Sequence, residues 1–279
     1  MLGVTKKVED MNYFELIAWL GIGSSHPGGF PATRQNIEIL EVTPEEYVLD
    51  AGCGTGLTAC YLAKTVGCRI MGVDINAQMI SKARLRAEKE GVSHLVEFKV
   101  ADVYNLPFSD NCFDLVMAES IIVFLDKVKA YQEFYRVLKP EGRVADLEMA
   151  LQRELPLNIR KQMEVCFGSS TNPLSFAEWV NAMNQAGFQD VEIKNAQTIK
   201  NRGNLVVNEL KKDWVLVKDL AQKISKQPGL IPRLQRNAQF MKRNLDYFGY
   251  GVVYGRKPAP AKLNFRDWLR QKIFRKKAI

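Results

Sequence analysis

Cysteine and histidine are scarce in this chain of 279 residues. Its five cysteines show no C-x-x-C spacing, and only two histidines are present to assist them. An odd number of scattered cysteines argues against a disulfide framework, and so few nitrogen and sulfur ligands argue against a zinc site. The sequence therefore predicts no metal site.

Long apolar runs are also missing. None approaches the roughly 18 residues that a membrane-spanning helix needs, and the first residues, MLGVTKKVEDMNYF, lack the apolar stretch of a signal peptide. These absences predict a cytoplasmic protein. Apolar side chains still make up 47% of the chain, enough at this length for one large folded domain with additions.

An excess of one charge sign is absent from most of the chain. The formal net charge of +8 arises entirely from residues 256–279, because residues 1–255 hold equal numbers of basic and acidic side chains. The body of the protein is therefore not expected to attract nucleic acid. The tail at 258–279 carries seven basic residues against Asp267, and two interpretations stay open: a solvated basic end, or an amphipathic helix at the inner face of an anionic membrane. The apolar face of such a helix would contain Phe265, Trp268, Leu269 and Ile273.

The strongest positive signal is the segment at residues 48–56, which reads VLDAGCGTG. An apolar run that ends in an acid, then alternating glycines, then a helical pattern at 57–65 predicts a strand, a tight turn and a helix. Glycine lets the backbone approach a ligand that a Cβ atom would push away. A second apolar run, at 70–73, ends in Asp74, so a carboxylate is expected at the tip of the neighbouring strand, where its two oxygens suit a ribose diol.

Two nucleotide cofactors fit such a turn, and spacing separates them. A dinucleotide fingerprint places its third glycine inside the helix, where this chain has Leu57. Asp50 would also repel a pyrophosphate, whereas its charge suits a cofactor that carries an ammonium group. The run VLDAGCGTG followed by GVDIN at 72–76 resembles the S-adenosylmethionine site of class I methyltransferases.

The resemblance continues along the chain over about residues 44–195. Residues 96–102 and 113–116 match the third and fourth strands of that family, and 135–143 match its turn from a helix into the fifth strand. The chain is most similar to the type 11 methyltransferases, which include enzymes of ubiquinone and menaquinone biosynthesis. It is therefore expected to be an S-adenosylmethionine-dependent methyltransferase.

The resemblance also assigns roles to individual residues. Asp74 would hold the ribose hydroxyls and Asp102 the adenine amino group, while the loop after Asp50 would face the methionine moiety. Ile75 and Val103 would sandwich the adenine ring. The residues expected to bind the cofactor are Asp50, Gly52, Cys53, Gly54, Gly56, Asp74, Ile75, Met79, Asp102, Val103 and Glu119.

Two side chains are candidates for the catalytic base. Glu119 is followed by Ser120, as in several sugar, sterol and glycine methyltransferases, but apolar residues at 121–124 replace the histidines that often come next. This departure favours an apolar acceptor pocket. His26, in a glycine-flanked loop, could supply the base or could be only a turn residue before Pro27.

These residues predict metal-independent, in-line methyl transfer to a small-molecule or lipid-like acceptor. Sequence motifs for gripping a flipped base or another macromolecular substrate are missing. A protein that binds the cofactor but is catalytically silent remains the alternative. The sequence leaves open the identity of the acceptor and the oligomeric state.

The alternation of strand and helix patterns predicts an α/β fold with a doubly wound, Rossmann-like sheet of seven strands. The last two strands form, by resemblance, an antiparallel pair at the sheet edge. Strands are expected at 47–50, 69–74, 95–101, 113–118, 143–149, 190–194 and 250–254, and helices at 77–90, 127–138 and 175–186.

Additions to the common fold are expected at three places. An N-terminal helical cap at 1–40 precedes the methyltransferase domain at 41–257, and the tail at 258–279 follows it. Between the last two strands, a helical insertion at about 200–246 is expected either to line the acceptor pocket as a lid or to cover the sheet edge. The apolar stripe of its second helix would contain Ile231, Leu234, Ala238, Met241 and Leu245.

Overall fold

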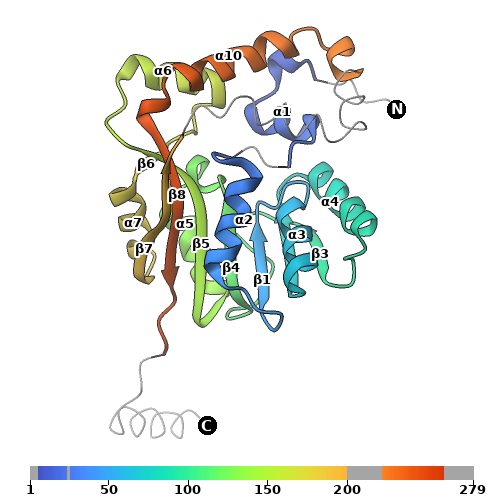
Figure 1. The fold of residues 1–279 in the computed structure, drawn as a ribbon, viewed down its shortest axis with the longest axis vertical. Helices are drawn as coiled ribbons and strands as arrows, with labels where there is room; N and C mark the ends of the chain where they lie inside the picture. The colour runs from blue at the N-terminus through green and yellow to red at the C-terminus, as the bar shows by residue number, and fades with distance from the viewer. Residues whose placement is uncertain (1–5, 24–25, 200–221, 261–279) are drawn as a thin grey trace, which may run out of the picture.

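The centre of the computed structural model is one twisted sheet, and the structure describes residues 6–23, 26–199 and 222–260. Neighbouring strands follow the order β3-β2-β1-β4-β5-β8-β7 (Figure 1), with the short β6 paired to β5. The strands are β1 (Tyr47–Ala51), β2 (Arg69–Asp74), β3 (Val96–Val100), β4 (Phe113–Glu119), β5 (Leu138–Leu151), β6 (Leu174–Ser175), β7 (Gln189–Thr198) and β8 (Phe248–Arg256).

Only β8 departs from the parallel arrangement of its neighbours, because it runs antiparallel to both β5 and β7. The remaining pairs, from β3 through β5 and including β6, are parallel. The predicted Rossmann-like sheet with an antiparallel edge pair is therefore confirmed. The two-residue β6 was not predicted.

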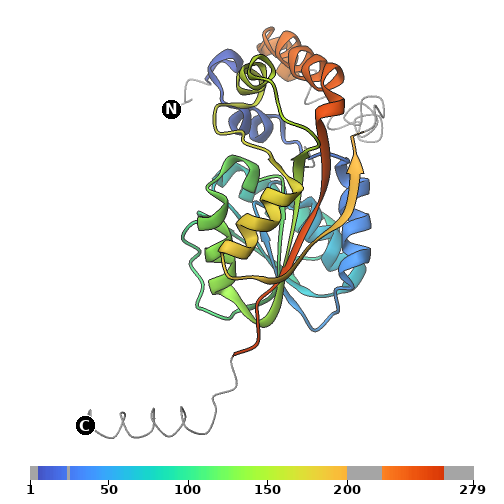
Figure 2. The same ribbon diagram turned by 90° about the vertical axis from the view of Figure 1, so that its left-hand side faces the viewer.

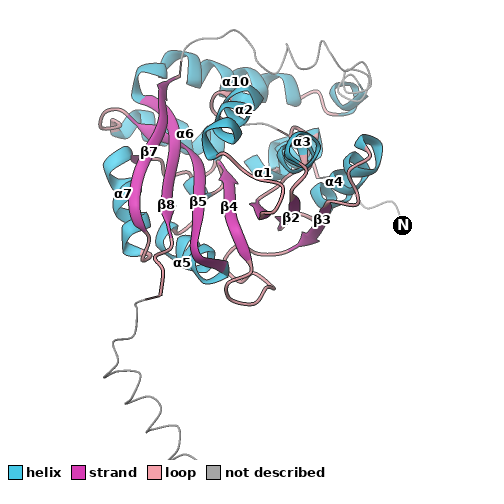
Figure 3. Cartoon of the chain, turned by 60° about the horizontal axis from the view of Figure 1, so that its bottom comes forward, coloured by secondary structure: helices cyan, strands magenta, loops and turns pink. Residues whose placement is uncertain are grey.

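Helices cover both faces of the sheet (Figures 2 and 3). One face packs against α2 (Gly29–Leu40), α3 (Leu57–Val66) and α4 (Ala77–Glu90), and the other against α5 (Lys127–Val137) and α7 (Phe176–Gln185). Because side chains alternate along a strand, β1 sends Val48 into the first core and Leu49 into the second. Each core contains side chains of several strands and of the helices on its face, so the strands are held in place from both sides.

A third layer lies beyond the carboxyl ends of the parallel strands and is here named the cap (Figure 1). It contains α1 (Tyr13–Leu20), α6 (Leu157–Phe167) and α10 (Leu230–Arg243), three helices that are far apart in the sequence. Leu16 and Leu20 of α1 pack with Leu230 of α10, and Met163 of α6 packs with Phe240 of α10. Of the predicted N-terminal cap at 1–40, α1 lies in this layer, whereas α2 packs against the sheet. The sequence did not predict α6.

The apolar stripe predicted for the inserted helix is only partly right: Leu234 and Met241 pack against the apolar clusters of the cap, but Ala238 is exposed. Ile231 is 43% exposed, whereas Leu230 and Phe240 are buried. Asn237 is buried as well, because its side-chain amide donates to the carbonyl of Cys166 at 3.2 Å. The part of the predicted insertion before residue 222, like the predicted tail helix, lies outside the described residues. In the described ranges, no helix combines the length and apolar character needed to cross a membrane.

Two acidic side chains of β5 lie inside the core beneath α5 and α7. Asp146 is 0% exposed and accepts a hydrogen bond from the hydroxyl of Tyr131 at 2.6 Å; Glu148 is 1% exposed. Burial raises the pKa of Asp146 to about 8, against the lowering effect of the Tyr131 hydrogen bond and of Lys127. The unfolded chain would titrate this group near 3.9.

This difference predicts that stability falls as pH rises. Between about pH 4 and 8 the folded state keeps a proton on Asp146 that the unfolded state has lost, so this one group lowers the free energy of unfolding by at most about 1.4 kcal/mol per pH unit. Asp146→Asn should remove much of this slope, because asparagine does not titrate. Urea unfolding at pH 5 and pH 8 measures both slopes, and identical slopes in the two proteins would contradict the assignment.

Candidate functional site

The four acids and three glycines predicted for the site lie at the carboxyl ends of the parallel strands. Asp50 and Asp74 stand at the carboxyl ends of β1 and β2, and Glu119 stands at that of β4. Asp102 follows β3 by two residues, and the loop at 52–56 follows β1. Because the strands are parallel, their carboxyl ends lie on the same side of the sheet, and α/β sheets bind ligands outside these ends. The cap lies over this edge (Figure 1).

The glycine loop adopts left-handed backbone angles at its three glycines: φ is 76° at Gly52, 52° at Gly54 and 71° at Gly56. A Cβ atom on Gly52 would come within 2.5 Å of Ile121, and one on Gly56 within 2.7 Å of Phe98. A Cβ atom on Gly54 would meet only the methyl group of Met79, at 3.7 Å. Packing therefore requires the outer two glycines, whereas Gly54 leaves space for a ligand.

Asp74 connects the glycine loop to the next helix. One carboxylate oxygen accepts the amide hydrogen of Gly54 at 3.0 Å, and the other accepts that of Asn76 at 2.8 Å. Each oxygen keeps a further lone pair, which a hydroxyl could use. Burial raises the pKa of Asp74, although these two amides lower it in part. The adjoining Ile75 is 73% exposed, so an apolar surface lies beside the carboxylate.

Asp102 and Val103 follow β3, the strand that pairs with the end of β2 at Asp74. The Asp102 carboxylate accepts the amide hydrogen of Tyr104 at 2.9 Å, and Asp102 bridges to Asn105 through the backbone. Both predicted adenine-side residues are thus in one turn, with Asp102 exposed and Val103 half-buried. Leu106 ends this turn inside the core.

Asp50 and Glu119 bring carboxyl groups into the buried part of the site. Asp50 is 4% exposed, and its Oδ2 atom has no hydrogen-bond partner within the described chain. Burial raises its pKa well above the ordinary value, and the nearby charges of Glu119 and Asp74 raise it further. A cation placed among these groups would favour their ionised forms. The site is therefore suited to a positively charged ligand.

The carboxyl group of Glu119 is held at one oxygen only. The hydroxyl of Thr58 donates to Oε2 at 2.6 Å, whereas Oε1 is buried and has no partner among the described residues. His26 lies behind it, with Nε2 at 3.8 Å from Oε2. This separation is too long for a hydrogen bond. The structure thus brings the two predicted catalytic residues together.

The surroundings of His26 restrict how its ring can act. Nδ1 lies 3.2 Å from the carbonyl oxygen of Pro27, which can only accept, and Nε2 lies 3.1 Å from the hydroxyl of Thr33. A neutral ring therefore donates from Nδ1 and accepts at Nε2. The imidazole is buried between Glu119 and α2.

Thr58 was not recognised in the sequence, and neither were the contacts that join the predicted apolar segment at 121–124 to the cap. Tyr13 of α1 stacks on Phe124 at 6.0 Å between ring centroids and meets Phe167 of α6 edge-on at 5.3 Å. These rings join the segment after β4 to the cap. A hydroxyl in the first turn after the glycine loop was a usable signal for Thr58. The aromatic contacts leave no local pattern, because Phe124 and Phe167 lie 111 and 154 residues after Tyr13 in the sequence.

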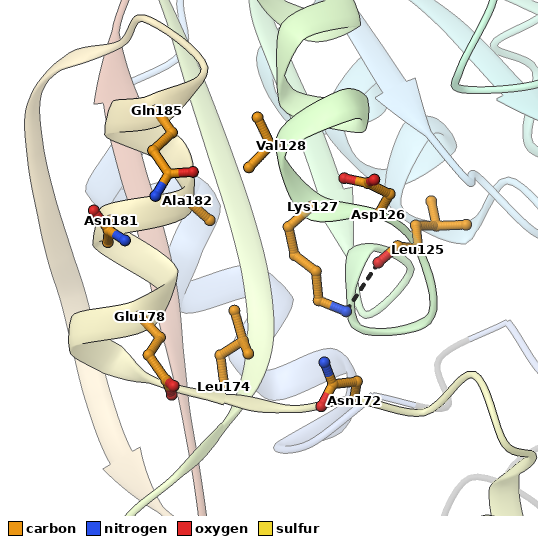
Figure 4. Close-up of a pocket in the computed structure, with 10 residues that line it drawn as sticks. All are labelled: Leu125, Asp126, Lys127, Val128, Asn172, Leu174, Glu178, Asn181, Ala182 and Gln185. Atoms are coloured by element: carbon orange, nitrogen blue, oxygen red, sulfur yellow. Dashed lines mark hydrogen bonds between the residues drawn. The ribbon is translucent and has the colours of Figure 1, made fainter.

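A cavity of about 390 Å³ lies between α5 and α7 (Figure 4). Lys127 lines it, with its ammonium group turned toward the carbonyl oxygen of Leu125. Asn181 and Gln185 project toward it from α7. None of the residues predicted for cofactor binding lines this cavity.

Comparisons with known proteins agree with this geometry. A family model described as a methyltransferase domain, of type 11, matches residues 49–145. An uncharacterized methyltransferase of Bacillus subtilis (strain 168), YodH, is 30% identical over 240 residues, which cover 86% of this chain and 97% of that protein. This chain belongs to the class I S-adenosylmethionine-dependent methyltransferases.

Solved structures with lower identity share the fold of this methyltransferase. The MccD protein superposes with a TM-score of 0.67 at 20% identity, covering 84% of this chain and 99% of that one. A Haemonchus contortus phosphoethanolamine N-methyltransferase, in complex with phosphomonomethylethanolamine and S-adenosylhomocysteine, superposes with a TM-score of 0.69 at 20% identity. That match covers 87% of this chain and 56% of the other.

The cofactor of this methyltransferase is S-adenosylmethionine, and the site has features that fit it. The cofactor carries a sulfonium and an ammonium group, and the unpartnered oxygen of Asp50 lies where a cation would offset buried negative charge. Gly54 provides space beside the backbone, and Ile75 provides an exposed apolar surface beside Asp74. These three residues therefore fit a ligand that carries a positive charge and an apolar ring.

Proposed function

We propose that this enzyme methylates a small-molecule or lipid-like acceptor without a metal ion. The observation that carries this proposal is the unpartnered, buried Oε1 of Glu119 at the edge covered by the cap. Phe124 and Tyr13 form an aromatic contact in the segment that follows Glu119. An apolar body with one protonated polar group would match such surroundings.

The named relatives support an acceptor of small size. The Haemonchus contortus protein binds phosphomonomethylethanolamine, and another solved structure with the same fold, at a TM-score of 0.59, is a geranyl diphosphate methyltransferase in complex with its diphosphate. One of these ligands is a short phosphorylated amine and the other an isoprenoid. Both are small molecules, so we extend that class to this chain.

We assign cofactor binding to the glycine loop and the surrounding strand ends. Asp74 would accept the ribose hydroxyls, Asp102 would face the adenine amino group, and Asp50 would lie nearest the cationic methionine end. S-adenosylmethionine supplies a methyl group bonded to a positively charged sulfur. The remaining contacts would come from Gly52, Cys53, Gly54, Gly56, Ile75, Met79, Val103 and Glu119.

Glu119 would orient the acceptor and take its proton. Thr58 holds Oε2 by donating its hydroxyl hydrogen, which leaves Oε1 as the atom that can accept from an incoming hydroxyl or amine. His26, 3.8 Å from Oε2, would stabilise the carboxyl group when its own ring is protonated. The cap would exclude water from the reacting groups.

The direct test is incubation with S-adenosylmethionine labelled in its methyl group together with fractionated metabolite and lipid extracts. We expect label in a small organic-soluble or polar product, formed equally well after treatment with a chelator. Cofactor binding without labelled product in any fraction would favour a catalytically silent protein instead. Loss of product after chelation would contradict the metal-independent reaction.

Asp74→Ala should weaken S-adenosylmethionine binding by about 10- to 100-fold, the range expected for lost hydrogen bonds to a charged group. Asp114→Ala is a matched control. Asp114 also accepts a backbone amide hydrogen, from Tyr47 at 2.9 Å, but it lies at the amino end of β4, at the other end of the strands from Asp74. Titration calorimetry should show normal affinity in the control. Equal affinities in both variants and the native chain would refute the assignment of Asp74.

A further inference from the structure

The turn after β4 touches both sides of the proposed site. It begins at Ser120, whose φ of 54° is unusual for a residue other than glycine, and whose amide donates to the carbonyl of Leu147 at 2.8 Å. Ile121 lies against Gly52, so closely that a Cβ atom there would clash. Phe124 stacks on Tyr13 of the cap. The position of this turn therefore affects both the cofactor loop and the cap.

Two buried side chains hold this turn from beneath. Glu148 of β5 accepts the amide hydrogen of Val123 at 3.0 Å through Oε1. Lys127, at the start of α5, donates to the carbonyl oxygen of Val123 at 3.0 Å and to that of Leu125 at 2.9 Å. Figure 4 shows the second of these bonds. An acid and a base thus bind opposite polar groups of the same short 3-10 helix, η2 (Ile122–Phe124).

The turn has few hydrogen bonds of its own. Phe124 and Leu125 donate from their backbone amides to Ile121 and Ile122, at 3.2 and 3.0 Å. Short 3-10 turns are intrinsically weak, so side-chain partners contribute a large share of their order. Burying an acid and an amine carries a desolvation cost that an apolar pair would avoid, which argues that their geometry has a use.

We propose that Glu148 and Lys127 are positioning residues, which hold residues 121–125 against the glycine loop and the cap and so maintain the cofactor and acceptor sites. This inference rests on the proposed function, because it concerns the same site. Neither residue needs to touch cofactor or acceptor, since their partners are the backbone of the turn.

Asp146 provides a matched control within the same strand. It lies two residues before Glu148, is equally buried and is bonded to Tyr131 of α5 rather than to the turn. Asp146→Leu and Glu148→Leu therefore remove the same kind of group from the same core. Only Glu148→Leu removes a contact with residues 121–125.

Amide hydrogen exchange of the full chain, followed by peptide mass, tests this distinction. In Glu148→Leu and in Lys127→Met we expect exchange in residues 120–126 to accelerate by about tenfold or more, with a rise of similar size in the dissociation constant of S-adenosylmethionine. Glu148→Gln should stay near the native values, because its amide oxygen can still accept from Val123. Asp146→Leu should leave the turn unchanged even where the whole fold is less stable.

The proposal is overturned if exchange in the turn stays native in a folded Glu148→Leu or Lys127→Met, or if Asp146→Leu loosens it equally. Should Glu148→Leu fail to fold, Lys127→Met decides by the same measurement. The exchange result does not depend on activity. A native chain that fails to bind S-adenosylmethionine would therefore contradict the proposed function and leave the exchange test of the turn in force.

Discussion

Glu119→Gln is expected to lower turnover by about 100-fold or more and to leave S-adenosylmethionine affinity nearly unchanged. Glutamine keeps the length and shape of the side chain but cannot take a proton from the acceptor. Thr58 can still donate to the amide oxygen, so the side chain should remain in place. The measurement is single-turnover methyl transfer to the acceptor identified by labelling, beside calorimetry of the cofactor.

Substitutions of two neighbouring residues, Thr58 and His26, test whether Glu119 acts as a base or has only a structural role. Thr58→Val should have a smaller effect, because it loosens Oε2 but leaves the carboxyl group able to accept a proton. His26→Ala should lower turnover as much as Glu119→Gln only if the imidazole is the base. Near-native turnover in Glu119→Gln would show that Glu119 is not the base, regardless of the turnover of His26→Ala.

Gly54→Ala is expected to weaken cofactor binding by about 100-fold, because its methyl group would occupy the space that the backbone offers to the ligand. Gly67→Ala is the control. Both glycines have left-handed φ, at 52° and 85°, and a Cβ atom on Gly67 would meet nothing within 4 Å. Each substitution should therefore cost about 1 kcal/mol of stability from backbone strain alone.

Comparing Gly54→Ala with Gly67→Ala separates an effect on cofactor binding from an effect on the stability of the fold. Similar unfolding free energies in the two variants, with cofactor affinity lost only in Gly54→Ala, would show that the loop faces S-adenosylmethionine at this point. If both variants bind the cofactor like the native chain, Gly54 does not approach it. Chemical unfolding and calorimetry on the same samples give both quantities.

The sheet and the glycine loop could be predicted because their signals are local. The acid, the turn and the helix start at 50–57 are covalent neighbours, and Asp74 ends a strand whose apolar run is visible in sequence. Placement of Glu119 followed from the same logic, since it ends β4. The positions of the strand ends and the parallel order of the strands were enough to predict that these groups lie close together.

The helix α6 could not be predicted because its sequence lacks a start signal and a clear apolar stripe. Pro156 precedes it without a side-chain cap, and Leu157 and Val165 are exposed while Met163 is buried. Its inner face is defined by contacts with distant elements, among them Phe240 of α10 and Phe248 of β8. Such tertiary contacts override local patterns and leave no trace in a short window.

The inner face of α10 was only partly predicted, and the burial of two acids of β5 was not anticipated, for a related reason. Asn237 is internal because a carbonyl of α6 accepts its hydrogen bond, and Glu148 is internal because it binds the turn after β4. Polar residues are assigned to the surface unless their partner is known. Here each partner lies on a different element, 71 and 25 residues away.

The antiparallel direction of β8 separates the two ends of this molecule. β8 begins at Phe248, under the cap, and ends at Arg256, paired with Arg143 at the opposite edge of the sheet. Nine residues of strand span about 30 Å at about 3.3 Å each. Lys257 is then fastened there, donating its amide hydrogen to Gly142 at 2.8 Å. A surface that held the chain beyond this point would therefore lie about one strand length away from the glycine loop and from the proposed cofactor site.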